Sequence, residues 1–246
     1  MTDIDSFIDN NVPSDGDEKI FNSCMELIVY SYHLMVKEPR IISRAKIAEI
    51  ARKVKKRKVK RVELEDYIRN ILIEEFIEPN QQLFGLKNVN FEAGVDENLM
   101  GIKSGMLDIK VKSPLLNGKT YYVFECKRLN KKIIDNYVTE GIVRFSSRQY
   151  YPQIPVTRAG MISFLESDKS KNLLLIVDAS KELISVIEKH KASCNLETNL
   201  LAHKLTSHDK DVDGFQYVFT SVHSREDVNP IKLYHIVLDY NALVIP

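Results

Sequence analysis

Two stretches decide the fold: GMLDIKVK at residues 105–112 and TYYVFECK at residues 120–127. The first stretch alternates apolar and polar side chains, and the second contains the apolar run Tyr121-Tyr122-Val123-Phe124; both patterns are typical of β-strands, whose side chains point to the two faces with a period of two. This period places Glu125 and Lys127 on one face of the second strand, and it places Asp108 opposite the apolar face of the first strand. If the two strands pair, both carboxylates and the ammonium group are expected to meet at one place.

Pro114 and the Asn117-Gly118 pair separate the two stretches and are strong turn signals, so we predict a hairpin. A carboxylate two residues before a lysine is weak as a motif, because it also occurs at Asp17-Lys19 and Asp108-Lys110. Only the third triplet, which begins at Glu125, ends an apolar run of the kind found in a central strand. Context therefore favours Glu125 and Lys127 as the chemically important pair.

The remaining patterns predict an α/β or α+β protein with helices and strands in a definite order. Helices are predicted at residues 20–36, 43–60, 62–77, 131–151 and 173–190, and further strands at 88–95, 160–165, 215–222 and 232–239. The chain divides into a flexible acidic tail (1–17), a helical N-terminal region with a basic run (18–61), a core (62–166), and a C-terminal α/β extension packed on the core (167–246).

Composition places the chain among soluble globular proteins. Apolar residues make up 44% and charged residues 28% of the 246 residues, and the formal net charge is +1. The three cysteines are odd in number and widely spaced, so we expect reduced thiols, a cytoplasmic location and no disulfide framework. The N-terminus lacks a basic and an apolar leader region, and no stretch is apolar enough to span a membrane.

The two strand carboxylates suggest a metal-dependent hydrolase. Asp108 and Glu125 offer hard oxygen ligands of the kind that Mg²⁺ prefers, and Mn²⁺ is an alternative. Lys127 could orient or help to deprotonate an attacking water molecule and offset the charge that develops at phosphorus. The structural alternative is that these three residues form an ordinary ion network on the surface of a sheet.

Two segments together resemble the motif of the PD-(D/E)XK, or restriction-endonuclease-like, superfamily. They are Gly105-Met106-Leu107-Asp108 and Val123-Phe124-Glu125-Cys126-Lys127. The resemblance implies an αβββαβ core over residues 62–166. It also implies that Asp108 and Glu125 bind a divalent metal, with the backbone carbonyl of Cys126 as a further ligand. Leu107 stands where the superfamily often has proline, which is a frequent departure.

Many members of that superfamily add a carboxylate from the helix before the strands. Here Glu65 lies three residues before Ile68 and so falls on the inward stripe of the helix, while Glu75, four residues after Ile71, is the competitor. We give Glu65 a slight preference, and an ordinary solvated glutamate remains an alternative.

Basic residues could contact nucleic acid in two places. A basic run precedes the core, and we select Lys55, Lys56, Arg57 and Lys58 as phosphate contacts. Arg144 and Arg148 are spaced four apart on the helix predicted after the motif, and that helix often borders the substrate in the superfamily. In both places the alternative is a solvated helix face.

The resemblance implies an Mg²⁺- or Mn²⁺-dependent endonuclease or exonuclease that hydrolyses phosphodiester bonds, with DNA favoured over RNA by the habit of the superfamily. A looser similarity, from Tyr137 to His235, links the chain to uncharacterised bacterial nuclease-like proteins associated with anti-phage defence. Sequence specificity would then come from a protein partner or be weak. The alternatives are a non-catalytic nucleic-acid-binding or assembly subunit, and a small-molecule or structural protein whose ion network mimics the motif.

Overall fold

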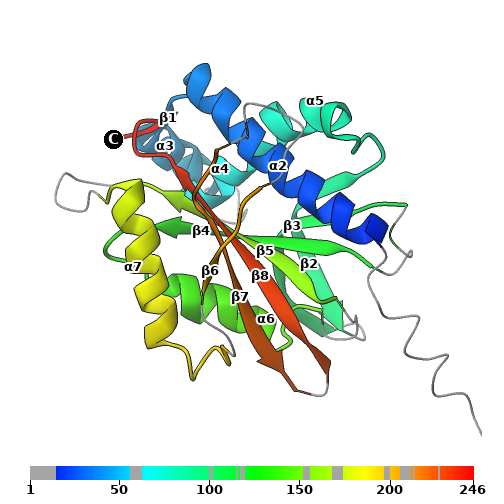
Figure 1. Ribbon diagram of the computed structural model, residues 1–246. Helices are drawn as coiled ribbons and strands as arrows, with labels where there is room; N and C mark the ends of the chain where they lie inside the picture. Colours follow the sequence, from blue (N-terminus) through cyan, green and yellow to red (C-terminus); the bar gives the residue numbers. More distant parts are fainter. Residues whose placement is uncertain are drawn as a thin grey trace, which may run out of the picture.

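A computed structural model describes residues 15–55, 63–99, 102–114, 116, 120–151, 156–167, 174–196, 200–205, 212, 214–226 and 228–246 (Figure 1). The helical elements are α2 (Asp15–Lys37), α3 (Arg44–Lys55), α4 (Leu64–Ile71), the π-helix η2 (Leu72–Ile77), α5 (Glu78–Asn80), the 3-10 helix η3 (Gln81–Phe84), the π-helix η4 (Val138–Ile142), α6 (Val143–Ser146) and α7 (Ile176–Lys189). The strands are β1 (Ile42–Ser43), β2 (Asn90–Leu99), β3 (Ile102–Lys112), β4 (Tyr122–Leu129), β5 (Arg158–Leu165), β6 (Leu201–Ala202), β7 (Val218–Arg225), β8 (Val228–Asp239) and β9 (Val244–Ile245).

A seven-stranded mixed sheet in the order β2-β3-β4-β5-β8-β7-β6 forms the centre of the protein. Strand β5 runs parallel to both of its neighbours, β4 and β8, whereas the other neighbouring pairs are antiparallel. The expectation of a mixed α/β protein is therefore confirmed. The predicted C-terminal strands lie in the same sheet as β2 to β5, because β8 pairs with β5 over eight residues.

Helix α2 packs on one face of the sheet through Phe21. Its ring stacks on that of Phe124 in β4, with centroids 5.3 Å apart. Phe124 in turn lies over Gly160 of β5, where a Cβ atom would come within 2.0 Å of the phenylalanine ring. Glycine is therefore required at this position.

Although α2 has 23 residues, no helix in the described part of the chain is long and apolar enough to cross a membrane.

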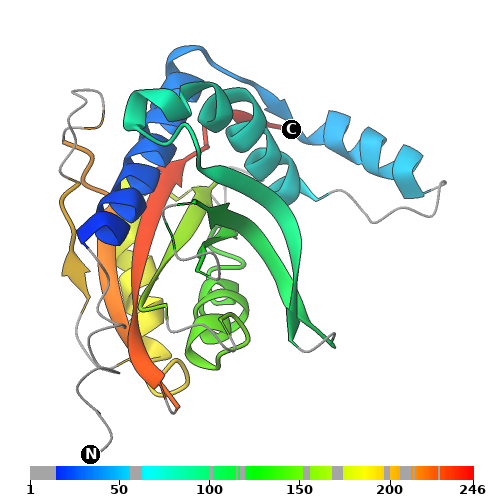
Figure 2. The same ribbon diagram turned by 90° about the vertical axis from the view of Figure 1, so that its right-hand side faces the viewer.

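The π-helix η4 packs on the opposite face of the sheet, which also carries Glu125 and Lys127. A Cβ atom on Gly141 would lie 2.7 Å from Cε of Met161 and 3.7 Å from Cγ of Lys127. Only glycine lets the helix approach β4 and β5 this closely. Figure 2 shows α2 and α6, which continues η4, on opposite sides of β8.

The predicted tail boundary at residue 17 is wrong for its last residues, since helix α2 begins at Asp15. The hydroxyl of Tyr122 donates a hydrogen bond of 2.9 Å to the carbonyl of Asp17, and the Phe21 side chain is fully buried. These two tertiary contacts stabilise a first turn whose composition is unfavourable for burial. Residues 1–14 lie outside the described part.

The continuous helix predicted at residues 131–151 is also wrong. Turns occupy residues 131–135, and the helical segment ends at Ser146. Arg148 and Tyr151 have positive φ angles of 61° and 57°, so the chain reverses there. The reversal lets Tyr150 and Tyr151 enter the core, where both side chains are buried, and this burial outweighs the helical periodicity.

Other predicted boundaries differ from the observed ones by a few residues, because hydrogen bonding across the sheet extends or shifts the strands. Strands β3 and β8 begin earlier than predicted, β2 ends later, and β4 and β7 are shifted towards the C-terminus. The predicted helix at 62–77 changes to π-helical geometry at Leu72. The short parallel pair of β1 and β9 was not predicted. The predicted Asn117-Gly118 turn lies outside the described residues.

A chain of buried polar groups runs beneath the helices on the Glu125 face. The hydroxyl of Tyr137 lies 2.9 Å from Nδ1 of His235, whose Nε2 lies 2.8 Å from Oγ of Ser221. The same Oγ lies 2.6 Å from Nε2 of His223. Burial, and then the neighbouring His223, hold the pKa of His235 well below its ordinary value. The imidazole of His235 is therefore neutral in the native state.

Acidification is expected to destabilise the fold through His235. An unfolded histidine takes up a proton near pH ~6.5, whereas the folded ring resists protonation, so the unfolded state binds more protons as the pH falls. This residue alone should lower the free energy of unfolding by up to ~1.4 kcal/mol per pH unit below that point. Urea denaturation of wild type and His235→Gln at pH 7.5 and 5.5 should show a smaller pH dependence in the variant. An identical pH dependence would contradict this assignment.

Candidate functional site

The structure brings Asp108, Glu125 and Lys127 together on adjacent strands. Nζ of Lys127 lies 2.6 Å from Oε1 of Glu125 and 3.7 Å from Oδ2 of Asp108. All three side chains are buried, and Glu125 has no exposed surface. The alternation of β3 and β4 explains the arrangement, because Leu107 and Ile109 point to the other face and are fully buried.

Glu65 joins this cluster from helix α4. Its Oε2 accepts a hydrogen bond of 2.8 Å from the backbone N–H of Arg128, and its Oε1 lies 3.5 Å from Nζ of Lys127. Glu75 instead forms an ion pair of 2.8 Å with Arg40, and both of these side chains are exposed. Of the two helix glutamates weighed from the sequence, Glu65 is the one beside the strand residues.

The ammonium group of Lys127 lies among four oxygen atoms from different parts of the chain. Three belong to the carboxylates of Glu65, Asp108 and Glu125, and the fourth is the backbone carbonyl of Cys126 at 3.0 Å. The backbone N–H of Cys126 donates to Oδ2 of Asp108 at 2.8 Å, which holds that carboxylate against β4. These oxygen atoms together form a small cation-binding cage.

Arginines on two helical segments complete the charge balance. Nη1 of Arg69, on α4, lies 2.9 Å from Oδ1 of Asp108. Nη1 of Arg144, on α6, lies 2.7 Å from Oε1 of Glu125. Arg144 thus contacts a carboxylate of the cluster, whereas it was predicted as a phosphate contact. Arg69 was not selected from the sequence, although it lies four residues after Glu65 and therefore on the same helix face.

Tyr150 is a further member of the cluster that the sequence did not indicate. Its hydroxyl lies 2.6 Å from Oε2 of Glu125 and 2.9 Å from the carbonyl of Met106, and it accepts a hydrogen bond of 2.7 Å from Arg144. The hydroxyl has one proton and two acceptors in range. It can donate to ionised Glu125, or accept a proton from neutral Glu125 while donating to Met106. The contact therefore suits both protonation states of the carboxyl group.

The predicted common face of Arg144 and Arg148 does not exist, because α6 ends between them. Nη1 of Arg148 lies 3.5 Å from the backbone carbonyl of Glu226, away from the cluster. In the basic run, Lys56, Arg57 and Lys58 lie outside the described residues. Lys55 is the last residue of α3, and its side chain is not described either. Their predicted phosphate contacts stay predictions.

Burial and mutual attraction shape the protonation of the cluster. Burial, and then the charge of Asp108, raise the pKa of Glu125 to about 8. Burial likewise raises the pKa of Glu65. Burial opposes the charge of Lys127, but attraction from Glu125, Asp108 and Glu65 outweighs it, so the pKa of Lys127 is raised. At neutral pH the ammonium group of Lys127 is charged, while Glu125 holds its proton more strongly than an ordinary glutamate does.

The donor set fits a hard divalent cation in its chemistry. Mg²⁺ and Mn²⁺ favour carboxylate and carbonyl oxygens, and the cage offers Asp108, Glu125, Glu65 and the carbonyl of Cys126. Within the described ranges, no group of three or more His, Cys, Asp or Glu side chains is already arranged to hold a metal ion. A cation at this place would need the Lys127 ammonium group to move towards solvent or substrate.

The buried pair of Arg69 and Asp108 should contribute more to stability than an exposed pair. Arg69→Met removes the cation from Asp108 and from Asp66, which lies 3.0 Å away, and should lower the free energy of unfolding by about 3 kcal/mol. Arg40→Met, which breaks the exposed pair with Glu75, is the matched control and should cost less than about 1 kcal/mol. Equal losses in urea denaturation would show that Asp108 does not depend on Arg69.

No protein-family model, no curated protein and no solved structure matches this chain. A functional proposal for this chain therefore depends on the contacts among Glu65, Asp108, Glu125 and Lys127. Three acidic and three basic side chains meet beside the backbone carbonyl of Cys126, on the strand that lies between β3 and β5.

Proposed function

We propose that this chain is a nuclease that hydrolyses phosphodiester bonds with the help of Mg²⁺ or Mn²⁺, and that its core is of the PD-(D/E)XK type. One observation carries the proposal. The Lys127 ammonium group lies within 3.7 Å of oxygen atoms from Asp108, Glu125 and Cys126, which belong to the motif, and from Glu65, which the helical stripe favoured over Glu75. Residues from β3, β4 and α4 thus converge on one cation-binding cage.

The order of elements also supports a nuclease core. A helical segment (α4 and η2) precedes three antiparallel strands (β2, β3 and β4), a second helical segment (η4 and α6) follows, and β5 then pairs parallel to β4. This is the αβββαβ order that the resemblance implies for residues 62–166. DNA remains favoured over RNA by that resemblance alone.

The side chains of the cluster have separable roles in the proposed reaction. Asp108, Glu125 and the carbonyl of Cys126 would hold the cation, with Glu65 as an additional ligand. A bound divalent cation supplies Lewis-acid stabilisation of charge on the phosphate and favours deprotonation of water. Lys127 would orient the attacking water molecule and offset negative charge at phosphorus. Arg69 and Tyr150 position the two carboxylates through the contacts described above.

A second candidate is a non-catalytic nucleic-acid-binding or assembly subunit. The observation that favours it is the charge balance, in which Arg69 pairs with Asp108 and Arg144 with Glu125. Such a network is also what a structural ion cluster needs. Incubation of purified protein with plasmid, linear duplex and single-stranded DNA separates the two candidates, because only a nuclease cleaves any of these substrates when Mg²⁺ or Mn²⁺ is added.

Asp108→Asn, Glu125→Gln and Lys127→Met should each reduce cation-dependent cleavage by roughly two orders of magnitude or more, measured at a temperature where circular dichroism shows each variant to be folded. The double change Asp108→Asn with Lys127→Met should be hardly worse than either single change, because groups that act as a unit are not additive. Asp135→Asn, at an exposed ion pair with Lys189, is the matched control and should cleave like wild type. Wild-type cleavage by Asp108→Asn at saturating Mg²⁺ would rule out this site.

Glu65→Gln should reduce cleavage or cation affinity more than Glu75→Gln does. Glu65 is within reach of Lys127, whereas Glu75 pairs with Arg40 on the surface, so only the first substitution removes charge from the cage. Cleavage rates and Mg²⁺ titrations of the two variants measure the difference. The reverse order would reassign the role to Glu75, and two negligible effects would exclude both glutamates.

A further inference from the structure

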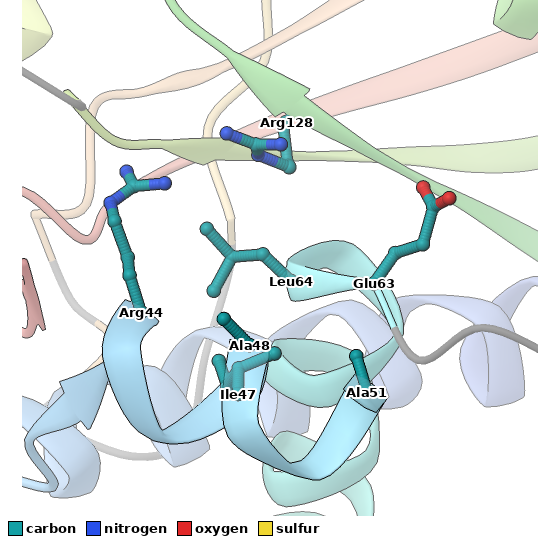
Figure 3. A pocket seen from close by; sticks show the side chains of 7 residues that line it. All are labelled: Arg44, Ile47, Ala48, Ala51, Glu63, Leu64 and Arg128. Carbon is teal, nitrogen blue, oxygen red and sulfur yellow. The ribbon is translucent and has the colours of Figure 1, made fainter. Parts of the chain in front are cut away.

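A separate cavity of about 360 Å³ adjoins the acidic cluster (Figure 3). It lies between helix α3, the start of helix α4 and the end of strand β4. The lining combines two arginines, one glutamate and an apolar wall: Arg44, Arg128, Glu63, Ala48, Ala51 and Leu64. A volume of this size is within the range of small-ligand sites, which begins at ~300 Å³.

The two arginines are held in place by a buried carboxylate. Glu166 has no exposed surface, and its Oε1 lies 2.8 Å from Nε and 2.7 Å from Nη2 of Arg128. Its other oxygen contacts Nη2 of Arg44, which also donates to the carbonyl of Ser167 at 3.0 Å. Two anchored guanidinium groups beside one cavity supply the positive charge and the N–H donors that bind phosphate. Because they are already positioned, binding would lose little side-chain entropy.

The rest of the lining suits a flat, partly apolar group. Ala48 and Ala51 present methyl groups from α3, and Leu64 lies between the helix and the arginines (Figure 3). In the same view the carboxylate of Glu63 lies across the pocket from the guanidinium group of Arg44. A carboxylate in this place can accept hydrogen bonds from the N–H groups of a nucleobase.

The pocket adjoins the proposed catalytic cluster near the end of strand β4. The backbone N–H of Arg128 donates to Glu65 at 2.8 Å, while the side chain of Arg128 lines the pocket. Arg128 also follows Lys127 directly, and Leu64 directly precedes Glu65. Because side chains alternate along β4, the side chain of Arg128 points to the other face of the sheet from Lys127. A strand whose phosphate lies beside Lys127 would therefore pass over the end of β4 to reach this pocket.

We propose that the pocket binds one unpaired nucleotide of the substrate strand, with its phosphate on Arg44 and Arg128 and its base against Ala48, Ala51 and Leu64. This inference rests on the proposed nuclease function, and it adds the class of substrate. A base held in a duplex is paired and stacked, so it cannot enter a cavity between a helix and a strand. The preferred substrate is therefore single-stranded nucleic acid, or a strand with an unpaired nucleotide beside the cleaved bond.

The test is a binding measurement that does not depend on cleavage. Fluorescence anisotropy in EDTA compares a labelled single-stranded oligonucleotide with a blunt duplex of the same sequence. Ala51→Leu fills the pocket and should weaken single-strand binding by roughly tenfold or more, with little effect on the duplex. Ala45→Leu, on an exposed part of α3 outside the pocket lining, is the matched control and should bind like wild type.

Two further measurements test whether the pocket binds both the phosphate and the base of a nucleotide. Arg128→Gln keeps the backbone N–H bonded to Glu65 and should reduce the salt dependence of single-strand binding by about 0.7 in the log–log slope, as expected for one lost phosphate contact. A free nucleoside monophosphate should displace the oligonucleotide from wild type but not from Ala51→Leu. Equal displacement by inorganic phosphate would overturn the base contact.

The outcomes separate this inference from the proposed function. If Ala51→Leu binds the single strand like wild type while plasmid cleavage is normal, the pocket assignment is overturned and the nuclease function stands. If no cleavage occurs with any cation but Ala51→Leu still weakens single-strand binding, the nucleotide pocket stands and the nuclease function is overturned. Tighter binding of the duplex than of the single strand by wild type would also overturn the pocket assignment.

Discussion

The burial of Glu125 on a central strand is the constraint on which the surrounding structure depends. A carboxylate removed from water is costly unless charged or hydrogen-bonding partners surround it. Here Lys127 comes from the same strand, Arg144 from α6, and Tyr150 from the segment where the chain reverses. Two other parts of the chain, α6 and the segment at Tyr150, are thus fixed relative to β4 by one side chain.

The balance of charge around Glu125 gives the cluster two properties at once. The ammonium group of Lys127 in the cage gives the carboxyl groups of Asp108 and Glu125 a charged partner in the absence of a metal ion. The same oxygen atoms suit a divalent cation, and Lys127 is a flexible side chain that can leave the cage when such a cation enters. One set of contacts therefore forms the ion network and would also serve the proposed catalytic site.

Much of the central sheet and of the cluster could be predicted from sequence, because both depend on local alternation. The period of two in β3 and β4 was sufficient to place Asp108, Glu125 and Lys127 on one face, and the helical stripe favoured Glu65 over Glu75. Tyr150 was missed because it reaches Glu125 only where the helical pattern is broken by a left-handed residue at Arg148. Tertiary burial decides that break, and no local pattern records it.

The place of β5 between β4 and β8 has a consequence for folding during synthesis. Strand β5 hydrogen-bonds to β8 along its whole length, and β8 begins at Val228, about sixty residues after β5 ends. Until that later strand has left the ribosome, the nascent chain carries an open, apolar sheet edge beside the cluster. Chaperone protection of this edge is thus most needed while the last third of the chain is being made.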